Sequence, residues 1–496
     1  MFKDATVEEV NAALQSSWEA FEVYRSLNLK QRANFLRAIA DELTAAEKEL
    51  VQTASRETHL EEPRLMGELK RTIFQLTSYA KACEEGAWLD IRIDTADPNR
   101  TPPKVDLRKM LVPLGPVVVF GASNFPFAYS TSGGDTACAL AAGCPVLIKA
   151  HPAHAETSEL QAQAIKKAAQ KCNLPEGIFI HVHGSGFEVR KALVQHPLTR
   201  AVGFTGSFEG GKALFDLANS REMPIPVFAE MGSVNPVFLL PEKLKRETAA
   251  IADMYAASIT VSVGQFCTNP GIIVGIESEE LTEFIQLLGK KIESIKPAKM
   301  LHVGIAKNFH KKRSEALAQA EVSVAGQATI EAQEDESIPT IAQTTGEAFL
   351  NNPILHKEIF GPYSLVVKCK DMDEMLAVVQ HTEGQLTASL MATNEEVKEN
   401  ISLINALQHI CGRFVLNGVP TGVEVALAMH HGGPYPSTTD SRFTSVGADG
   451  IKRFARPICY QNFADELLPP ELKNENPLGL WRTVNNELTN RPIGQH

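Results

Sequence analysis

Short apolar segments alternate with longer amphipathic segments between residues 114 and 230. The apolar segments, each of strand length, are residues 117–120, 146–149, 178–183, 201–204 and 226–230. Segments with helical spacing of apolar residues lie between them, near residues 131–142, 158–171, 187–195 and 210–219. This alternation predicts an α/β fold, a parallel sheet with helices on both faces. Ligands of such sheets bind at the carboxyl ends of the strands, so residues directly after each strand are the first candidates for a site.

The rest of the chain predicts further domains. A length of 496 residues is too great for one hydrophobic core, so two or three domains are expected. Residues 7–83 show helical spacing of apolar positions. Residues 101–112 begin with prolines and continue with alternating polar and apolar residues, which predicts an extended arm. A second α/β region runs from about residue 233 to residue 445.

Composition and charge exclude several classes of protein. The formal net charge of −11 gives no general affinity for nucleic acid or acidic lipid. No apolar run reaches the roughly 18 residues that a membrane span needs, and the first residues are acidic where a signal peptide would be basic and then apolar. Eight cysteines without a Cys-x-x-Cys pair indicate a reduced compartment and predict no disulfide framework and no metal site. We therefore expect a cytoplasmic protein that binds neither nucleic acid nor membrane.

One thiol lies in a loop suited to chemistry. Cys267 belongs to the run Gly264-Gln265-Phe266-Cys267-Thr268-Asn269-Pro270-Gly271, directly before a short apolar strand. A cysteine on a turn is open to substrate, and nearby backbone N–H groups can stabilise negative charge there, so Cys267 is a candidate nucleophile. The alternative is a small buried hydrophobic residue, as most cysteines are.

Polar residues directly after the predicted strands add to this site. Asn124 follows strand 117–120 and can aim its side-chain N–H at a developing oxyanion, unless it only caps a helix or turn. Glu230 ends a very apolar strand, which predicts a pKa near neutrality and a general base acting on water, unless it only caps the strand. Lys149 ends strand 146–149 and can hold ribose hydroxyls or phosphate, unless it is a solvated strand end. Gly206 and Ser207 form a strand–turn–helix junction that can bind a pyrophosphate, although one glycine-rich turn is weak support.

Six motifs in this order resemble the aldehyde dehydrogenase superfamily over roughly residues 7–456. They are Asn124-Phe125-Pro126, Lys149, Phe204-Thr205-Gly206-Ser207, Glu230-Met231-Gly232, Gly264-Gln265-Phe266-Cys267 and Glu358-Ile359-Phe360-Gly361-Pro362. The resemblance implies a Rossmann-type cofactor domain (residues 1–100 and 114–231), an α/β catalytic domain (232–445), and a small β oligomerisation arm with a C-terminal tail (101–113 and 446–496). It also implies a homodimer or a dimer of dimers.

The resemblance also implies a role for each site residue. The thiolate of Cys267 would add to an aldehyde, and Asn124 with the Cys267 N–H would hold the oxyanion while a hydride passes to nicotinamide. Glu230 would then activate the water that hydrolyses the thioester. The remaining residues would bind the cofactor: Lys149 and Glu358 at the ribose hydroxyls, Gly206 and Ser207 at the pyrophosphate, and Phe360 beside them.

Two departures from the family pattern refine the prediction. The acidic residue expected three positions after Lys149 is replaced by Pro152, which removes the repulsion against a 2′-phosphate and favours NADP, with NAD still possible. The segment from His430 to Arg442, together with residues 120–126 and 264–271, resembles the 2,5-dioxopentanoate (α-ketoglutarate semialdehyde) dehydrogenase subgroup and related NADP-dependent bacterial fatty aldehyde dehydrogenases. The implied reaction is oxidation of 2,5-dioxopentanoate to 2-oxoglutarate, with a fatty or other aliphatic aldehyde as the alternative substrate.

Two residues of that segment are candidates for holding the substrate carboxylate. His431 falls where the family's aldehyde tunnel is lined, so it can hydrogen-bond a carboxylate or merely pack beside the turn. Arg442 can pair with a carboxylate or form a surface salt bridge. An acylating enzyme that uses coenzyme A is a further alternative, which Glu230 argues against because a water-activating base would hydrolyse the thioester. Intact Cys267, Asn124 and Glu230 argue against an inactive homologue that keeps only the fold.

Overall fold

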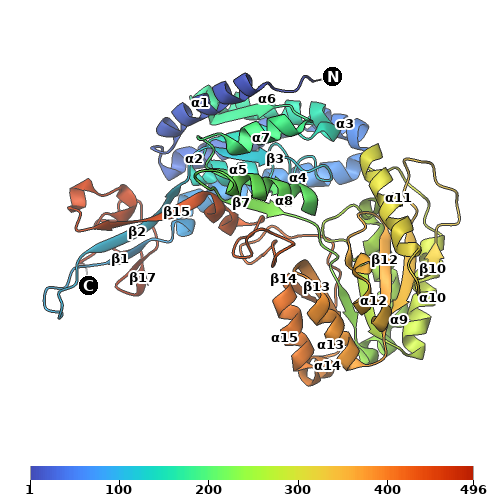
Figure 1. The fold of residues 1–496 in the computed structure, drawn as a ribbon. Coiled ribbons are helices and arrows are strands. Elements are labelled where there is room, and N and C mark those ends of the chain that lie inside the picture. The colour runs from blue at the N-terminus through green and yellow to red at the C-terminus, as the bar shows by residue number, and fades with distance from the viewer. Residues whose placement is uncertain (1, 495–496) are drawn as a thin grey trace.

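The structure is a computed structural model that describes residues 2–494. The predicted N-terminal unit and the predicted tail therefore include three residues, 1, 495 and 496, that lie outside the described residues. The strands form three sheets: a five-stranded parallel sheet, a seven-stranded sheet and a five-stranded mixed sheet that projects from the molecule (Figure 1).

The first sheet is parallel throughout, with the strand order β5-β4-β3-β6-β7. Its strands are β3 (Val117–Phe120), β4 (Val146–Lys149), β5 (Phe179–Val182), β6 (Ala201–Thr205) and β7 (Val227–Glu230). Side chains alternate between the two faces of a strand: Val117 and Val119 pack in one apolar core, Val118 and Phe120 in another. A strand buried on both faces has to be apolar throughout, which explains the uninterrupted apolar runs in this part of the sequence.

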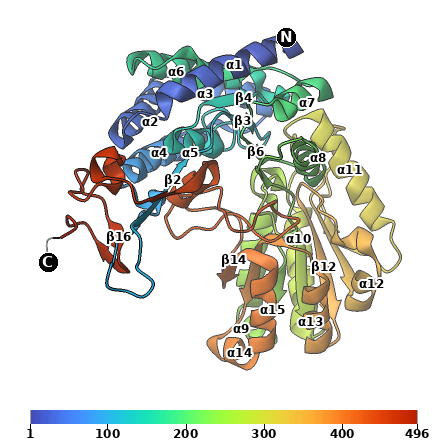
Figure 2. The same ribbon diagram turned by 60° about the vertical axis from the view of Figure 1, so that its left-hand side comes forward.

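Helices cover both faces of this sheet (Figure 2). One core is shared by α2 (Leu29–Ala45), α3 (Glu47–Thr58), α4 (Glu62–Glu85), α5 (Gly134–Ala142) and α6 (Ala155–Lys171). The other is shared by α1 (Val7–Tyr24), α7 (Phe187–Gln195) and α8 (Phe208–Asn219). The N-terminus of α1 carries a capping box, in which the Thr6 hydroxyl accepts from the Glu9 N–H and the Glu9 carboxylate accepts from the Thr6 N–H.

The second sheet has the order β10-β11-β12-β9-β8-β13-β14, and only β10 runs antiparallel to its neighbour. Its strands are β8 (Val237–Leu239), β9 (Ile272–Ile276), β10 (Ser323–Gln327), β11 (Thr340–Thr345), β12 (Tyr363–Cys369), β13 (Gln385–Met391) and β14 (Cys411–Leu416). One face packs on α9 (Pro241–Thr260) and α10 (Glu279–Glu293). The other packs on α11 (Val303–Leu317), α12 (Gly346–Asn351), α13 (Met372–His381), α14 (Asn394–Glu399) and α15 (Ile401–Ile410).

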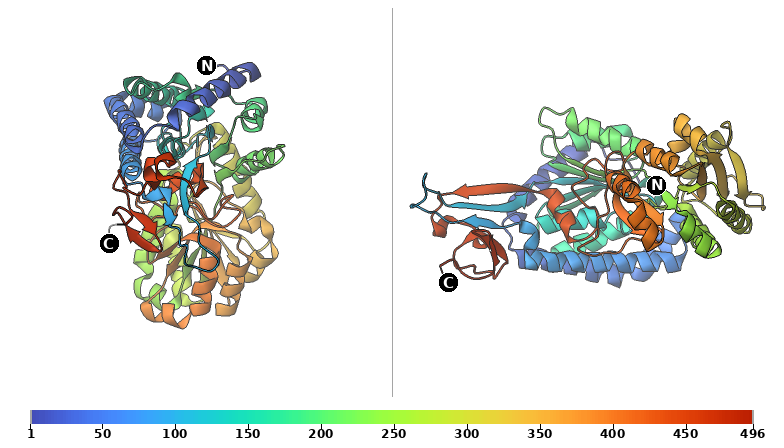
Figure 3. Two further views of the ribbon diagram at one scale, coloured as in Figure 1. Left: turned by 90° about the vertical axis from the view of Figure 1, so that its left-hand side faces the viewer. Right: turned by 90° about the horizontal axis from the view of Figure 1, so that it is seen from below.

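The third sheet forms an arm that extends from the first α/β unit (Figures 1 and 3). Its order is β15-β2-β1-β16-β17, built from β1 (Arg92–Asp94), β2 (Leu107–Pro113), β15 (Ala455–Gln461), β16 (Arg482–Val484) and β17 (Glu487–Thr489). Strand β1 lies before residue 101, where the predicted arm begins. The sequence does not place β1 in the arm, because β1 joins this sheet only through its pairing with β2 and β16. Strand β16 lies far along the chain, and Arg92 of β1 is opposite its Thr483.

Short 3₁₀ helices connect these elements: η1 (Ala87–Leu89), η2 (Pro152–His154), η3 (Glu176–Ile178), η4 (Val261–Gly264), η5 (Pro353–His356), η6 (Ala448–Phe454), η7 (Asp465–Leu467) and η8 (Pro470–Leu472). Within residues 2–494, no helix combines the length and the apolar character needed to cross a membrane.

The alternation of strands and helices predicted for residues 114–230 is confirmed, and the differences are at element ends. The helix expected near residue 131 begins at Gly134, after a turn. The helix expected near residue 210 begins at Phe208, because Ser207 caps it by accepting a hydrogen bond from the Gly210 N–H at 3.1 Å. Four of the five strands of this sheet, β3, β4, β6 and β7, thus end at a predicted site residue or up to four residues before one.

Candidate active site

Three chain segments meet between the two parallel sheets: the end of β7, the loop between η4 and β9, and residues 417–447, which form no regular helix or strand (Figure 2). The last segment is fastened to the end of β7. Glu230 forms a bridge with Thr438, and the Met231 N–H donates to the Ser437 carbonyl at 2.8 Å. These backbone contacts bring residues more than 150 positions apart into one site.

The centre of this site is a group of three side chains. The Nε2 of His431 lies 3.7 Å from the Cys267 sulfur and 3.1 Å from the Glu230 Oε1. One potential ligand atom from each of the three lies within 4.8 Å of the others. Glu230 and His431 are buried, while Cys267 is half-buried. The arrangement presents a thiol, a carboxylate and an imidazole to one point, and this is the composition of a nucleophile with groups that can take its proton.

The pKa values of the three groups correct one prediction. Burial acts to raise the pKa of the Glu230 carboxyl, but His431, together with the Ser445 hydroxyl, outweighs it and holds that pKa below its ordinary value. Glu230 is therefore charged at neutral pH, and its pKa is not near neutrality as the sequence predicts, because the sequence does not reveal the buried partners. Burial, and then the charge of Glu230, raise the pKa of the Cys267 thiol well above its ordinary value.

Asn124 reaches the loop that carries Cys267. Its Nδ2 donates to the Gln265 carbonyl at 3.0 Å, two residues before the thiol. Its own backbone carbonyl accepts from Arg64, on α4, at 2.9 Å. The side-chain amide is buried and donates to the loop that carries Cys267, so it does not cap a helix.

Two positioning residues escaped the sequence prediction. Asn235 donates from Nδ2 to the backbone carbonyls of Cys267 and Asn269 at 2.8 and 2.9 Å, and it has a positive φ of 45°. Ser445 donates from its hydroxyl to Glu230 Oε2 at 2.8 Å. The only signal in the sequence is the place of Asn235, shortly after the Glu230-Met231-Gly232 motif, and nothing marks Ser445. Both act by holding the reacting groups still.

Three of the residues predicted to bind a cofactor, Lys149, Gly206 and Ser207, lie at the carboxyl edge of the first sheet. Lys149 ends β4, and its Nζ donates to the Gly184 carbonyl at 3.1 Å. The Gly206 N–H donates to the Glu230 carbonyl at 3.0 Å, and Ser207 opens α8 as its N-cap. A twelve-residue helix with its N-terminus at a sheet edge can bind an anion, as a pyrophosphate site requires.

Glu358 and Phe360 come from the second α/β unit. A cavity beside the nucleophile loop is lined by both residues and by Phe266. A Cβ at Gly232 would lie 2.6 Å from Glu358 Oε2, so the absence of a side chain at Gly232 leaves the room that this carboxyl occupies. Burial raises the pKa of the Glu358 carboxyl to about 7. A half-buried carboxyl of this kind can accept hydrogen bonds from the hydroxyls of a ribose.

Two arginines near the site were not predicted. Burial, and secondly the charge of Arg190 on α7, lower the pKa of the Lys149 ammonium to about 8. The Nε of Arg190 is buried and has no hydrogen-bond partner among the described residues. Arg71, on α4, lies over the Tyr129 ring at 5.4 Å and acts electrostatically on Cys267. Its Nη1 is buried and has no partner within residues 2–494. Unpaired buried guanidinium nitrogens point to anions as ligands.

The two residues predicted to hold a substrate carboxylate are placed differently. The side chain of Arg442 is 79% exposed, and its guanidinium pairs with Asp440 at 2.8 Å between Nε and Oδ1. Arg442 therefore forms a surface salt bridge. The Nε2 of His431 faces Glu230 and Cys267, while its Nδ1 is buried with no hydrogen-bond partner among the described residues. A second carboxylate on the same Nε2 would lie against Glu230 and be repelled by it. The contacts of Arg442 therefore match the alternative of a surface salt bridge, and the role of His431 at the substrate carboxylate stays a prediction.

The chain is similar to known proteins over nearly its whole length. The aldehyde dehydrogenase family matches residues 1–457. The chain is 45% identical to alpha-ketoglutaric semialdehyde dehydrogenase 2 of Azospirillum brasilense, over 97% of this chain and 92% of the relative. It is 44% identical to the alpha-ketoglutaric semialdehyde dehydrogenase of Acinetobacter baylyi, over 99% of this chain and 93% of the relative.

A solved structure agrees in fold. The glyceraldehyde-3-phosphate dehydrogenase GapN of Methanocaldococcus jannaschii, complexed with NADP, superposes with a TM-score of 0.78 at 18% identity. The match covers 93% of this chain and 95% of that one. The α/β fold with its parallel sheets, predicted from the resemblance, is confirmed. The family match over residues 1–457 and the 45% identity over 97% of the chain identify the family as well as the fold. This chain is an enzyme of the aldehyde dehydrogenase family.

Proposed function

We propose that the chain oxidises 2,5-dioxopentanoate to 2-oxoglutarate with NADP as the oxidant. The observation that carries this proposal is the 45% identity over 97% of the chain to a relative named alpha-ketoglutaric semialdehyde dehydrogenase. The site supports it, because a short aldehyde with a carboxylate at its far end needs a cation near the nucleophile, and the unpaired Nη1 of Arg71 provides one.

The proposed reaction begins at Cys267. Its sulfur adds to the aldehyde carbon, and the thiol proton passes to the group formed by His431 and Glu230, which lie 3.1 Å apart. Transfer to this pair is needed because the pKa of the thiol is raised by burial and by the Glu230 charge. The oxyanion that forms accepts hydrogen bonds from the Cys267 N–H and from Asn124 Nδ2. Asn124 gives up its hydrogen bond to the Gln265 carbonyl in order to bind the oxyanion.

The reaction ends with hydrolysis of a thioester at Cys267. A bound nicotinamide cofactor would accept the hydride from the carbon attached to the Cys267 sulfur. Glu230, charged and held by Ser445 at 2.8 Å, then takes a proton from the water that attacks the thioester carbonyl. His431, between Glu230 and the sulfur, is assigned the transfer of the thiol proton, and Asn235 keeps the loop in place through the Cys267 carbonyl.

Arg71 is proposed to bind the substrate carboxylate in place of the predicted His431 and Arg442. The change Arg71→Met should lower kcat/KM for 2,5-dioxopentanoate about 10- to 100-fold, because one hydrogen bond between two charged groups is lost. The rate with a neutral aldehyde of equal length should change little. Lys70→Met, an exposed neighbour on the same helix, is the matched control. An equal loss with both aldehydes would contradict this role and leave Arg71 a structural residue.

Lys149, Glu358, Phe360 and the turn at Gly206 and Ser207 are proposed to hold NADP, with NAD as a weaker oxidant. The 2′-phosphate is assigned to Arg190, because Pro152 leaves no carboxylate to repel it and the buried Arg190 Nε lacks a partner among the described residues.

Arg190→Ala should reduce kcat/KM for NADP about 10- to 100-fold and leave that for NAD nearly unchanged, since only NADP carries the 2′-phosphate. Steady-state rates with each cofactor test this, with Lys191→Ala, exposed on the same helix, as the control. A parallel loss with both cofactors would exclude Arg190 as the 2′-phosphate ligand.

We propose the remaining site and assembly features on the same basis. The cofactor and catalytic domains are assigned to residues 1–100 with 114–231 and to residues 232–445, with strand β1 moved to the arm. A homodimer or dimer of dimers would form through the arm, which exposes Trp481, Leu488 and the edge strand β17.

Eight cysteines without a disulfide between them, all within the described residues, support a cytoplasmic location.

The test of the proposed substrate is the initial rate of cofactor reduction with 2,5-dioxopentanoate and with a medium-chain aliphatic aldehyde, each with NADP and NAD. A higher kcat/KM for the dioxo acid with NADP is expected. A preference for the aliphatic aldehyde would overturn the proposed substrate and favour the fatty aldehyde alternative, while the chemistry at Cys267 would stand.

A further inference from the structure

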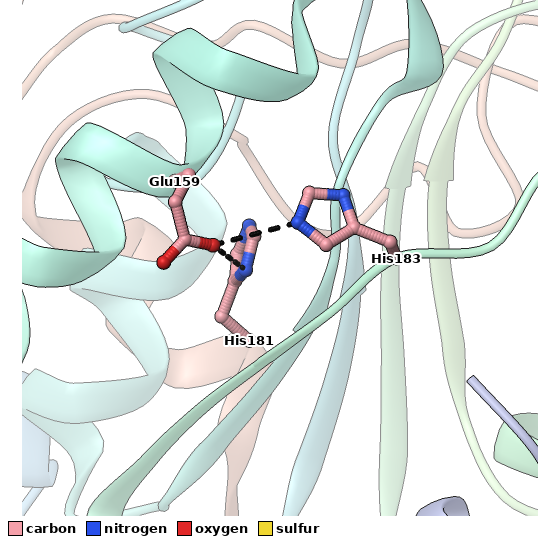
Figure 4. Close-up of side chains that lie close together, drawn as sticks. All are labelled: Glu159, His181 and His183. Carbon is pink, nitrogen blue, oxygen red and sulfur yellow. Dashed lines mark hydrogen bonds and ion pairs between the residues drawn. The ribbon is translucent and has the colours of Figure 1, made fainter. Parts of the chain in front are cut away.

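Outside the candidate active site, two histidines and a glutamate converge at the end of β5. His181 lies in β5, His183 follows it directly, and Glu159 lies on α6, which packs against this strand. Figure 4 shows one oxygen of the Glu159 carboxylate facing both imidazole rings. Glu159 Oε2 is 3.2 Å from His181 Nδ1 and 3.4 Å from His183 Nε2, and one ligand atom of each residue lies within 4.8 Å of the others.

The backbone explains this convergence. Residues two apart in an extended chain point to the same side, so His181 and His183 project together from the end of β5. Glu159 lies on the first turns of α6, the helix that covers this side of the strand. The group therefore joins two elements that are neighbours only in the folded protein, 22 to 24 positions apart in sequence.

The distances fit a shared metal ion. Zn²⁺ binds imidazole nitrogen and carboxylate oxygen at about 2.0–2.2 Å in tetrahedral geometry, which places two ligand atoms about 3.3–3.5 Å apart. The two separations from Glu159 Oε2, 3.2 and 3.4 Å, are close to this edge length, and the two histidine nitrogens lie within 4.8 Å of each other. The longer one exceeds the usual N–H···O distance of about 2.7–3.2 Å, so a hydrogen bond describes the His183 contact less well.

The orientations of both rings are fixed by neighbours. His181 Nε2 lies 2.9 Å from the Ser158 hydroxyl, which also bonds Thr131, and with Nε2 as donor the Nδ1 keeps its lone pair towards Glu159. The His183 ring stacks on Phe2 at 4.1 Å between centroids and 7° between planes. Outer contacts that hold a histidine tautomer and ring plane are typical of metal sites.

One side of the group is open to solvent. The Glu159 side chain is 31% exposed and that of His183 is 16% exposed, while His181 is buried. Three protein ligands with an open position leave room for water as a fourth ligand and a path for the ion to enter.

We propose that Glu159, His181 and His183 form a binding site for Zn²⁺. The bound ion would join α6 to the end of β5, one residue before Gly184, whose carbonyl accepts from Lys149. Binding to the folded chain stabilises it, so the melting temperature should rise with the Zn²⁺ concentration. The proposal rests on this geometry and is independent of the proposed reaction.

The test uses the full chain without a histidine tag, carrying Cys267→Ser so that the group of Glu230, Cys267 and His431 loses its thiol ligand. Equilibrium dialysis against Zn²⁺ should give one ion per chain. His183→Ala and Glu159→Gln, both at partly exposed positions, should each weaken binding about tenfold or more. His409→Ala, an exposed histidine on another helix, is the control and should bind as before.

Two further readouts connect a loss of binding to this site. Co²⁺ in place of Zn²⁺ should give the visible absorption of a tetrahedral centre in the Cys267→Ser protein and not in the His183→Ala derivative. Without metal, the melting temperatures of all these variants should agree, which shows that the substitutions leave the fold intact. Zn²⁺ binding of equal strength in the His183→Ala and Glu159→Gln proteins, or no stoichiometric binding in their parent, would overturn the proposal.

Discussion

Replacing Cys267 by alanine should reduce aldehyde oxidation at least about 10⁴-fold, since the covalent route disappears with its nucleophile. The fold should be retained, because Cys267 is half-buried and the loop around it is held by the Asn235 side chain, whose Nδ2 donates to the Cys267 carbonyl at 2.8 Å. The measurement is the rate of NADP reduction at saturating 2,5-dioxopentanoate, together with the melting temperature.

The matched control is Cys172→Ala, at a partly buried thiol that follows α6 and takes no part in the site. It should keep the rate of the unchanged enzyme. Alkylation of the unchanged enzyme with iodoacetamide should abolish turnover with incorporation at Cys267. Substantial oxidation by the Cys267→Ala protein would remove the nucleophile assignment, and with it the thioester mechanism.

Glu230→Gln should slow steady-state turnover about 10²- to 10⁴-fold, the range expected when a general base is lost. A first equivalent of reduced cofactor should still form rapidly, because the thioester accumulates when water is no longer activated. Rapid mixing with excess aldehyde and NADP, followed by absorbance of the reduced cofactor, separates the burst from the slow phase.

The geometry makes the outcome of the Glu230→Gln experiment informative about His431. The His431 Nε2 lies between the carboxylate, at 3.1 Å, and the sulfur, at 3.7 Å. A retained burst indicates that His431 can take the thiol proton without the carboxylate. If the burst is lost together with turnover, Glu230 acts before the thioester forms. Glu156→Gln, at an exposed carboxylate paired with Arg56, is the control and should change neither phase.

The charge of Glu230 illustrates what sequence patterns do not contain. The apolar run before Glu230 predicts a buried carboxyl, and the structure confirms the burial. The direction of its pKa shift depends on His431 and Ser445, which lie 201 and 215 positions further along the chain and reach it only through the folded path of residues 417–447. Burial alone would raise the pKa, and partners of opposite charge or with donor groups reverse the sign.

Which arginines lie near the site also depends on contacts between segments that are far apart in the sequence. Arg442 stands in a segment with a strong family resemblance, yet its side chain points to solvent and pairs with Asp440. Arg71 and Arg190 stand in segments with no motif, and the fold brings them to Cys267 and Lys149. Local sequence reports which residue types are present. Which cation faces the site depends on how α4 and α7 pack against the sheet.

The sequence by itself determined the α/β class, the alternation of strands and helices in the first α/β unit and the family, because apolar runs, turn residues and six short motifs are local features. Only the tertiary structure decided the partners of Glu230, the arginine beside the nucleophile, the place of β1 in the arm and the convergence of Glu159 with His181 and His183. The physical reason is distance along the chain. Contacts between segments that are far apart are fixed by packing and strand pairing, whose free energies depend on the whole fold.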